Sequence, residues 1–285
     1  MNASIPILLR AHDVVGACID RAFPPSAGTD EIRRWDTFWR ARRETAERTG
    51  IIYEHHTPVK KLLYENLTDS LEACVGGSLL GCRVAEFGSG SGYAGLCVAA
   101  RGAHVVMIDA GEEAVRYSRF VAECLGLADR IAWVRADAQL PVAALGAFDL
   151  CFNSGVVEHY PPEVASTMLK HMAAAVRPGG IVWAAVPNLV SPLLLYRMMR
   201  SRSKGTERFY TPWLLRRVFR MAGLPRVNAG CLNAFVSVEA SELVQRVVAR
   251  VRPQRWACCL SSLFYCWAVA PERSSLCSRN LSSLS

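Results

Sequence analysis

The segment from Val84 to Tyr93 constrains the fold of this chain more than any other feature. A short apolar run interrupted by one acid is followed by three glycines that alternate with serines, and a helix-like segment then extends to Arg101. Glycines allow sharp turns and a close approach of the backbone to a ligand. A strand that enters a glycine turn and opens a helix is typical of parallel α/β folds that hold nucleotide-like ligands.

Short apolar runs and helical segments alternate after Cys82. We expect strands at 82–87, 104–108, 131–135, 148–153 and 181–186. The intervening helices are expected at 92–101, 112–125 and 162–176. This alternation predicts a mostly parallel sheet with helices on both faces. Runs at 226–231 and 263–270 would add strands at one edge, with a helix from Ala240 to Val251 between them.

The N-terminal part is expected to be helical. Residues 30–49 read as one helix, and a second begins at Pro58 with Thr57 as its N-cap and ends at Gly76-Gly77. We expect a helical N-terminal extension or lid over 1–56, a main domain over 57–271 and a flexible tail over 272–285. Within the main domain, residues 191–225 form a basic, lid-like insertion.

Composition sets broad limits on location and partners. The 285 residues are 51% hydrophobic, which is ample for a sizeable core, and the net charge of +8 permits anionic partners without choosing among them. Eleven cysteines without a Cys-x-x-Cys pair predict buried thiols in a reducing compartment, so we expect a cytoplasmic location. Met1–Arg10 does not resemble a signal peptide, and the charge-free run 256–270 is shorter than the ~18 residues that span a bilayer.

Carboxylates follow two of the expected strands. Asp109 lies about 20 positions beyond the glycine loop, where a carboxylate can accept hydrogen bonds from ribose hydroxyls. Its alternative role is the N-cap of the helix that starts near Glu112. Asp137 ends the third strand and could accept from an exocyclic amine, or it could be a solvated loop residue.

The order of these motifs resembles the class I S-adenosylmethionine-dependent methyltransferases, in particular their small-molecule, quinone-biosynthesis-like branch. The matching motifs are Glu-Phe-Gly-Ser-Gly-Ser-Gly, Asp109, Ala-Asp-Ala at 136–138, Gly-Val-Val-Glu-His at 155–159 and Arg-Pro-Gly-Gly at 177–180. The resemblance covers residues 55–225. It implies a Rossmann-like, seven-stranded sheet with an antiparallel last strand, and S-adenosylmethionine as cofactor.

The resemblance also assigns roles around the methionine part of that cofactor. Gly88, Ser89, Gly90 and Gly92 would form the loop beneath it. Glu86 would help to hold its amino group through water or backbone contacts.

Further roles carry over to the adenosine and to the reactive end. Asp109 would bind both ribose hydroxyls, with Ala110 beside the adenine. Asp137 would accept from the adenine amine, with Ala138 next to it. Asn153 would line the carboxypropyl end, near the methyl group that is transferred.

The expected activity is transfer of this methyl group to a small-molecule acceptor by in-line displacement, with O-methylation favoured. His159 is the candidate general base; alternatively, Glu158-His159 opens the next helix or holds the loop together. In some quinone O-methyltransferases this loop binds a metal through two acids and the histidine, but Gly155 stands at the first acidic position, so we expect no metal. His55 and His56 are weaker candidates, with surface or capping roles as the alternative.

Two other functions share parts of this pattern. A nicotinamide-dependent oxidoreductase would use the same loop and ribose carboxylate, but Glu86, Asp137 and the 177–180 turn are not typical of one. A non-catalytic cofactor-binding protein on the same fold is the other alternative.

The remaining predictions concern covers and partners. Trp35, Phe38, Trp39 and Tyr53 would give an aromatic cover over the substrate, or pack an added helix. Residues 197–226 hold nine Lys or Arg residues against one acid and include a basic amphipathic helix at 213–222. Its polar side is either simply solvated or docks an anionic lipid, a membrane or an acidic substrate. We therefore expect an anionic or lipid-like acceptor, peripheral membrane contact and no nucleic acid.

Overall fold

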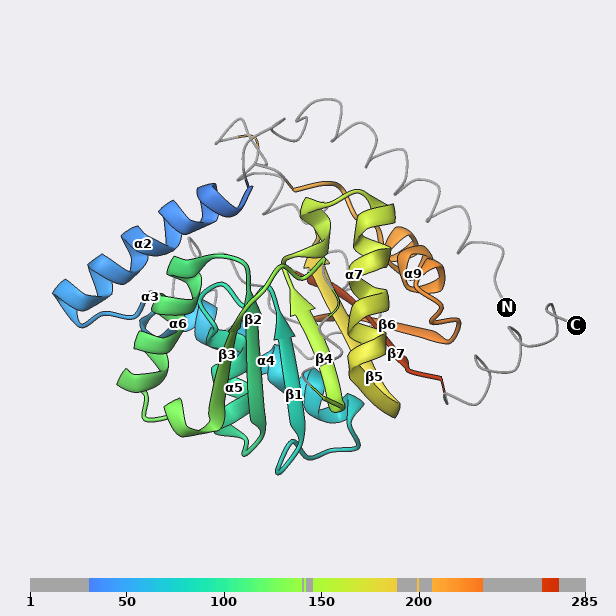
Figure 1. The fold of residues 1–285 in the computed structure, drawn as a ribbon, viewed down its shortest axis with the longest axis horizontal. Coiled ribbons are helices and arrows are strands. Elements are labelled where there is room, and N and C mark those ends of the chain that lie inside the picture. The colour runs from blue at the N-terminus through green and yellow to red at the C-terminus, as the bar shows by residue number, and fades with distance from the viewer. Residues whose placement is uncertain are drawn as a thin grey trace, which may run out of the picture.

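A seven-stranded sheet forms the centre of the protein (Figure 1). The computed structural model describes residues 31–139, 141, 146–188, 199, 207–232 and 263–271. The strands are β1 (Arg83–Phe87), β2 (His104–Asp109), β3 (Ile131–Arg135), β4 (Phe148–Ser154), β5 (Val176–Pro187), β6 (Val227–Leu232) and β7 (Leu263–Val269). Their order across the sheet is β3-β2-β1-β4-β5-β7-β6.

The strands from β3 to β5 are parallel, and β7 runs antiparallel to both β5 and β6. This topology confirms the predicted fold class and the antiparallel last strand. β1 is buried at every residue except Arg83, as expected for a central strand covered on both faces. Both late runs, at 226–231 and 263–270, form the edge strands that the sequence predicts.

The fifth strand corrects one prediction. Residues 177–180 were expected to make a tight turn before a strand at 181, whereas β5 already starts at Val176. The reason is pairing on both sides of the strand. Val176 pairs with Phe148 of β4, and on the other side Gly179 N–H donates to the Ala270 carbonyl and Ala270 N–H donates to the Gly180 carbonyl. Gly179 accommodates the local distortion at a φ of +76°.

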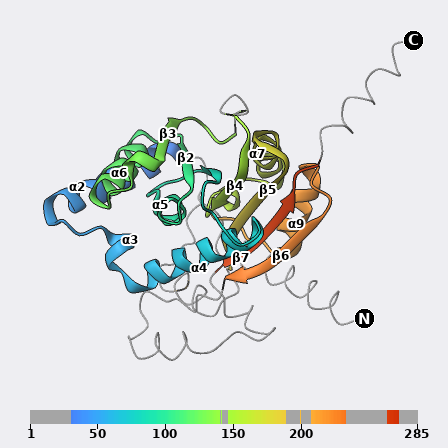
Figure 2. The same ribbon diagram turned by 90° about the horizontal axis from the view of Figure 1, so that it is seen from below.

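Helices cover both faces of the sheet (Figures 1 and 2). They are α2 (Glu31–Thr49), α3 (Tyr53–His56), α4 (Pro58–Cys74), α5 (Tyr93–Ala100), α6 (Glu112–Cys124), α7 (Pro162–Ala175) and α9 (Pro212–Met221), with short 3-10 turns η1 (Ala128–Arg130) and η3 (Val157–His159). One core cluster packs α7 and α9 on the sheet, and the other packs α4, α5 and α6 on the opposite face. The predicted helices before and between the parallel strands are confirmed, and the short α3 is an addition.

Helix α2 packs beside α6 at the periphery of the fold (Figure 1). Trp39 of α2 stacks on Tyr117 of α6, with ring centroids 5.9 Å apart. The start of α4 differs in detail from the prediction, because Thr57 occupies the N-cap position without a side-chain cap hydrogen bond. At α9, by contrast, Thr211 caps the helix through an accepted bond from Leu214 N–H at 2.9 Å.

Some predictions fall outside the described residues. These are the helix from Ala240 to Val251, the tail 272–285, residues 1–30 and most of the segment 189–206. Within the part of the chain that the structure describes, no helix combines the length and apolar character needed to cross a membrane.

Candidate functional site

A cavity lies where the loops after four neighbouring parallel strands meet, because the carboxyl ends of those strands share one edge of the sheet. The loop after β1 contributes residues 88–91, the loop after β2 contributes 109–111, and the loop after β3 contributes 137 and 138. The loop after β4 contributes 154–156, 159 and 160. Ile32, Trp35 and Trp39 from α2 and Tyr64 from α4 complete the described wall.

The glycine loop is shaped by positive φ angles and by close neighbours. Gly88, Gly90 and Gly92 have φ values of +69°, +52° and +68°. A Cβ on Gly88 would lie 2.6 Å from a methyl of Val156 in the loop after β4. Gly92 does not line the cavity; it begins α5 and packs closely on Ser118. Glycine is therefore required both for the turn and for the contact between the two loops.

Asp109 holds the loop after β1 and the loop after β2 together. Its Oδ2 accepts a hydrogen bond from Gly90 N–H at 2.8 Å, and its Oδ1 accepts from Gly111 N–H at 2.8 Å. Burial raises the pKa of this carboxyl, while the donated N–H bonds act in the opposite direction. The N-cap position of α6 is Gly111, and Asp36 of α2 accepts from Glu113 N–H. Asp109 and Ala110 both line the cavity.

Glu86 lies beneath the loop rather than on the cavity wall. Its side chain is buried, and Oε2 accepts a hydrogen bond from Gly95 N–H of α5 at 3.0 Å. Burial raises the pKa of Glu86 to about 8, and the nearby charge of Asp109 adds to that rise. The carboxyl therefore supports the start of α5, just after the glycine loop.

The predicted residues of the third and fourth strands lie in different places. Asp137 and Ala138 line the cavity, and Asp137 Oδ1 accepts from Gln139 N–H at 2.8 Å. Asn153 is fully buried, and its amide contacts Met172 of α7 at 3.3 Å, away from the cavity wall. Because side chains alternate along a strand, its neighbour Ser154 reaches the cavity instead.

His159 lines the cavity from η3, directly after β4. The ring of Trp35 meets the imidazole edge-on, with centroids 5.7 Å apart. The segment before α9 holds the loop after β4 in place through two hydrogen bonds. Arg208 N–H donates to the Glu158 carbonyl, and the Tyr210 hydroxyl donates to the Tyr160 carbonyl. Glu158 is buried, which raises its pKa well above the usual value.

The pair Glu158-His159 does not open α7. That helix has Pro161 at its N-cap and Pro162 in its first turn. Within the described residues, no group of three or more His, Cys, Asp or Glu side chains is arranged to bind a metal.

The two other candidate histidines lie away from the cavity wall. His55 Nδ1 is 2.9 Å from the Tyr93 hydroxyl, and His56 Nδ1 is 2.8 Å from the Ile52 carbonyl. The His56 contact is local to the short helix α3.

The aromatic residues divide between wall and support. Trp35 and Trp39 line the cavity, Phe38 packs against both, and Tyr53 lies under Arg42. The sequence analysis did not identify Tyr64 as a cavity residue. Tyr64 lies within helix α4, and no sequence motif marks its position. Tyr160 was also missed, although the position next to His159 is a local signal for it.

Comparisons with known proteins agree with this geometry. Residues 84–180 match the family described as a methyltransferase domain. The chain is 29% identical over 160 residues to a ubiquinone biosynthesis O-methyltransferase of Aeromonas salmonicida (strain A449). That match covers 52% of the chain and 65% of the relative, so it spans less than two thirds of the relative's length.

Two solved structures share the fold. A putative O-methyltransferase of Nostoc punctiforme has a TM-score of 0.57 at 15% identity, covering 91% of this chain and 68% of that one. The magnesium protoporphyrin IX methyltransferase of Synechocystis PCC 6803 with bound SAM has a TM-score of 0.51 at 19% identity, covering 86% and 99%. The matched domain, the motif order and the shared fold together support a class I S-adenosylmethionine-dependent methyltransferase, with S-adenosylmethionine as the cofactor.

Proposed function

We propose that this protein transfers a methyl group from S-adenosylmethionine to a hydroxyl of a small-molecule acceptor. The observation that carries the proposal is one cavity lined by the glycine loop, by Asp109 and Asp137, and by His159. The matched domain supports methyl transfer, and the name of the Aeromonas relative supports oxygen as the acceptor atom.

The residues present fit the cofactor. The buried Ser89 hydroxyl lines the cavity and has no hydrogen-bond partner among the described residues. Gly88 and Gly90 line the cavity without side chains, and the carboxylates of Asp109 and Asp137 are acceptors for hydroxyl and amine donors. An unpaired buried hydroxyl beside such acceptors is expected where a polar ligand binds.

We assign the ends of the cofactor by these contacts. Gly88, Ser89 and Gly90 would lie under its methionine part, and Asp109 would accept from its ribose hydroxyls. Asp137 and Ala138 would lie beside the adenine, opposite Ala110. Gly92, Glu86 and Asn153 would act indirectly, since none of the three lines the cavity.

When bound, S-adenosylmethionine supplies an electrophilic methyl group. The chain's own contribution is to orient the acceptor and to exclude water. His159 is placed on the wall to accept the proton of an acceptor hydroxyl, and Trp35 restricts the orientation of its ring. Trp35 and Trp39 belong to the described part of the proposed N-terminal lid.

The lining favours a neutral, flat acceptor. Trp35, Trp39, Tyr64 and Tyr160 contribute apolar ring surface, and no Lys or Arg occurs among the described lining residues. An anionic acceptor would find no ion-pair partner on this part of the wall, so we propose a neutral, largely apolar molecule.

Calorimetry with S-adenosylmethionine and with NAD tests the cofactor assignment. We expect binding of S-adenosylmethionine alone; binding of NAD alone would contradict the proposal and favour the oxidoreductase alternative. Methyl transfer is then tested with labelled S-adenosylmethionine over phenols, carboxylic acids, amines and lipid-like acceptors. Turnover of none of them would favour a non-catalytic binding protein.

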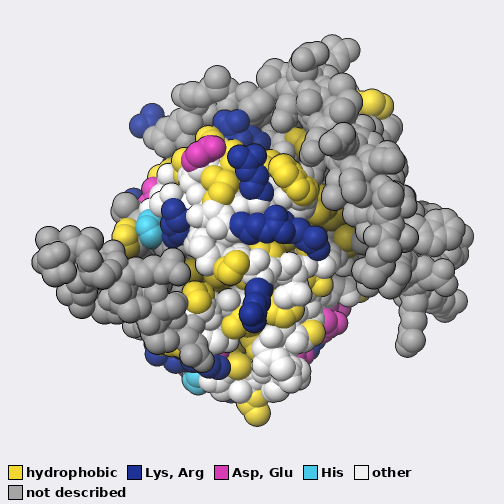
Figure 3. Space-filling model, turned by 90° about the vertical axis from the view of Figure 1, so that its right-hand side faces the viewer, with side chains coloured by type: hydrophobic (Ala, Val, Ile, Leu, Met, Phe, Trp, Pro, Cys, Tyr) yellow, Lys and Arg dark blue, Asp and Glu magenta, His cyan; other side chains and the backbone are white. Residues whose placement is uncertain are grey.

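We also propose that α9 mediates contact of a cytoplasmic protein with an anionic membrane surface. Leu215, Val218 and Phe219 are buried, whereas Arg216, Arg217 and Arg220 are exposed on the other side. On the side of the molecule where α9 lies, Lys and Arg side chains stand among apolar ones (Figure 3). An exposed basic helix face of this kind suits anionic headgroups.

Vesicle sedimentation tests this contact. The unaltered chain should sediment with phosphatidylglycerol-containing vesicles but not with neutral phosphatidylcholine vesicles. Replacing Arg216, Arg217 and Arg220 by Gln should abolish the difference, while replacing Arg33, Arg34 and Arg48, exposed on α2, by Gln should not. Equal sedimentation of the two variants would contradict a role for α9.

A further inference from the structure

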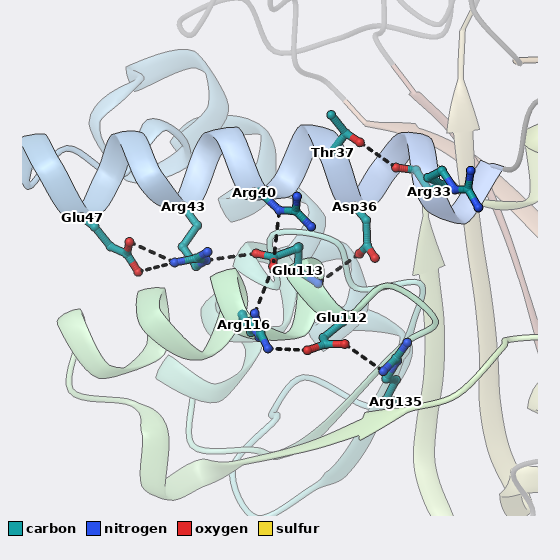
Figure 4. A network of polar contacts seen from close by, with 10 residues as sticks. All are labelled: Arg33, Asp36, Thr37, Arg40, Arg43, Glu47, Glu112, Glu113, Arg116 and Arg135. Atoms are coloured by element: carbon teal, nitrogen blue, oxygen red, sulfur yellow. Dashed lines mark hydrogen bonds and ion pairs between the residues drawn. The ribbon is translucent and has the colours of Figure 1, made fainter.

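Helix α2 is joined to α6 by charged side chains that converge on Glu113 (Figure 4). Glu113 lies on α6 with only 6% of its side chain exposed. Arg43 Nε of α2 lies 3.1 Å from its Oε2, and Arg40 Nε of α2 lies 3.6 Å from its Oε1. Arg116 of α6 adds a third guanidinium at 3.1 Å. The nearly buried carboxylate of Glu113 therefore forms ion pairs with two arginines of the neighbouring helix.

The main chain of the same residue is also bonded to α2. Asp36 Oδ1 accepts a hydrogen bond from Glu113 N–H at 3.0 Å, so α2 supplies the cap that the first turn of α6 lacks from its own N-cap residue, Gly111. A carboxylate at this position is favourable because the N-terminus of a helix carries partial positive charge. We call Asp36, Arg40, Arg43 and Glu113 the clasp.

The clasp holds the helix that completes the cavity wall. Trp39 reaches the glycine loop, where a Cβ on Gly90 would lie 2.7 Å from its ring, and Trp35 meets His159. Ala46 is the one apolar residue of α2 that is buried, if the described side chains are considered. Trp39 also stacks on Tyr117 of α6, so the attachment of α2 combines this aromatic contact with the charge pairs of the clasp.

We propose that Glu113 is a positioning residue for the cofactor site, although it does not line the cavity. By holding α2 through the clasp, it places Trp39 against the glycine loop and Trp35 against His159. Loss of its charge would release α2 and open the cavity to water. This inference rests on the proposed function, because the ligand whose affinity it controls is S-adenosylmethionine or its product.

The experiment compares two neighbouring glutamates. Glu113→Gln removes the charge within the clasp, whereas Glu112→Gln removes a charge that pairs with Arg116 and Arg135 and not with α2. Affinity for S-adenosylhomocysteine is measured by calorimetry, with thermal unfolding recorded for each variant. We expect Kd to rise about tenfold for Glu113→Gln and less than about twofold for Glu112→Gln.

A readout without ligand separates this inference from the proposed function. Hydrogen exchange of the α2 amides should become faster in Glu113→Gln, while exchange in α7, on the opposite face, stays unchanged. If the unaltered chain binds no S-adenosylhomocysteine, the proposed function fails whatever the exchange result. If that chain binds and Glu113→Gln changes neither affinity nor α2 exchange, the inference about Glu113 is wrong.

If Glu113→Gln does not fold, a second pair of variants at Arg43 tests the same proposal. Arg43→Met removes one arm of the clasp, and Arg43→Lys keeps its charge. Arg43 also pairs with Glu47 within α2, so Glu47→Gln serves as the control for that contact. We expect weaker binding for Arg43→Met, with Arg43→Lys and Glu47→Gln close to the unaltered chain. If Arg43→Met bound S-adenosylhomocysteine as tightly as Arg43→Lys and Glu47→Gln do, the proposal would be overturned.

Discussion

Asp109 and Gly90 are joined by a hydrogen bond of 2.8 Å from the glycine N–H to the carboxylate, across 19 positions of the chain. The bond fastens the end of β2 to the loop after β1. The same carboxylate accepts from Gly111, at the turn into α6. One half-buried carboxylate thus sets the relative position of two loops that line the cavity.

Replacement of Asp109 by Ala should weaken binding of S-adenosylmethionine by at least ~1 kcal/mol, because a charged acceptor for hydroxyl donors is lost. The loops would also lose their shared anchor, so the melting temperature should fall. Calorimetry measures the affinity. Asp129→Ala, at an exposed aspartate of η1, is the matched control and should change neither quantity. Unchanged affinity in Asp109→Ala would remove this carboxylate from the site.

Gly88 and Gly126 have nearly the same φ angle. Alanine substitutions at these two positions can therefore separate the cost of a side-chain clash from the cost of backbone strain. Gly88 and Gly126 have φ values of +69° and +67°, but a Cβ meets Val156 only at Gly88, and open space at Gly126. Gly126→Ala should cost about 1 kcal/mol of unfolding free energy through backbone strain alone. Gly88→Ala should cost ~1–3 kcal/mol more, because the methyl must displace the neighbouring loop. Urea denaturation measures both, and equal costs would contradict the tight contact.

The raised pKa of Glu86 predicts a pH-dependent stability. The folded state holds its proton up to a pKa of about 8, whereas the unfolded chain releases it near the ordinary value of 4.5. The folded state binds more protons between these values, so its stability should fall as pH rises from about 5 to about 8, by on the order of 3 kcal/mol from this group.

Glu86→Gln removes this titration and keeps an oxygen that accepts from Gly95 N–H. Its unfolding free energy should therefore vary less with pH than that of the unaltered chain, and exceed it most clearly near pH 8. Chemical denaturation at several pH values gives the comparison. Parallel pH profiles of the two proteins would show that Glu86 is ionised in the folded state.

His159→Gln tests the proposed proton acceptor. Once an acceptor molecule has been found, kcat should fall by about 10²-fold or more, because general base catalysis is lost. Affinity for S-adenosylhomocysteine should stay within about twofold, since the assigned cofactor contacts lie on other residues. Steady-state kinetics and calorimetry measure the two effects. A normal kcat would assign His159 a structural role in the loop after β4.

Local patterns in the sequence accounted for the sheet and for much of the cavity. Apolar runs such as 104–108 predict buried strands because a parallel sheet covered on both faces needs apolar side chains at nearly every position. The glycine loop, Asp109 and Asp137 follow strand ends, and parallel topology brings such ends to one edge. These predictions needed only local patterns and the parallel topology, and no knowledge of which distant side chains touch.

Asn153 shows where such reasoning stops. It was expected near the reactive methyl, but the pleat of β4 turns its side chain toward Met172 and brings Ser154 to the cavity. Which face a strand residue takes depends on the register of the whole sheet, and a one-residue shift reverses it. The strand motif by itself carries no information on that choice.

The sequence alone determined the class of fold, the glycine turn and the carboxylates at the strand ends, because these depend on local periodicity and backbone freedom. Only the tertiary structure decided that Glu113 holds α2, that Trp35 meets His159, and that Glu86 supports the loop from below. Each of these depends on how separate elements pack, since the partners lie from 9 to more than 100 positions apart. The attachment of α2 includes charge pairs across such distances, and no local pattern in either helix specifies them.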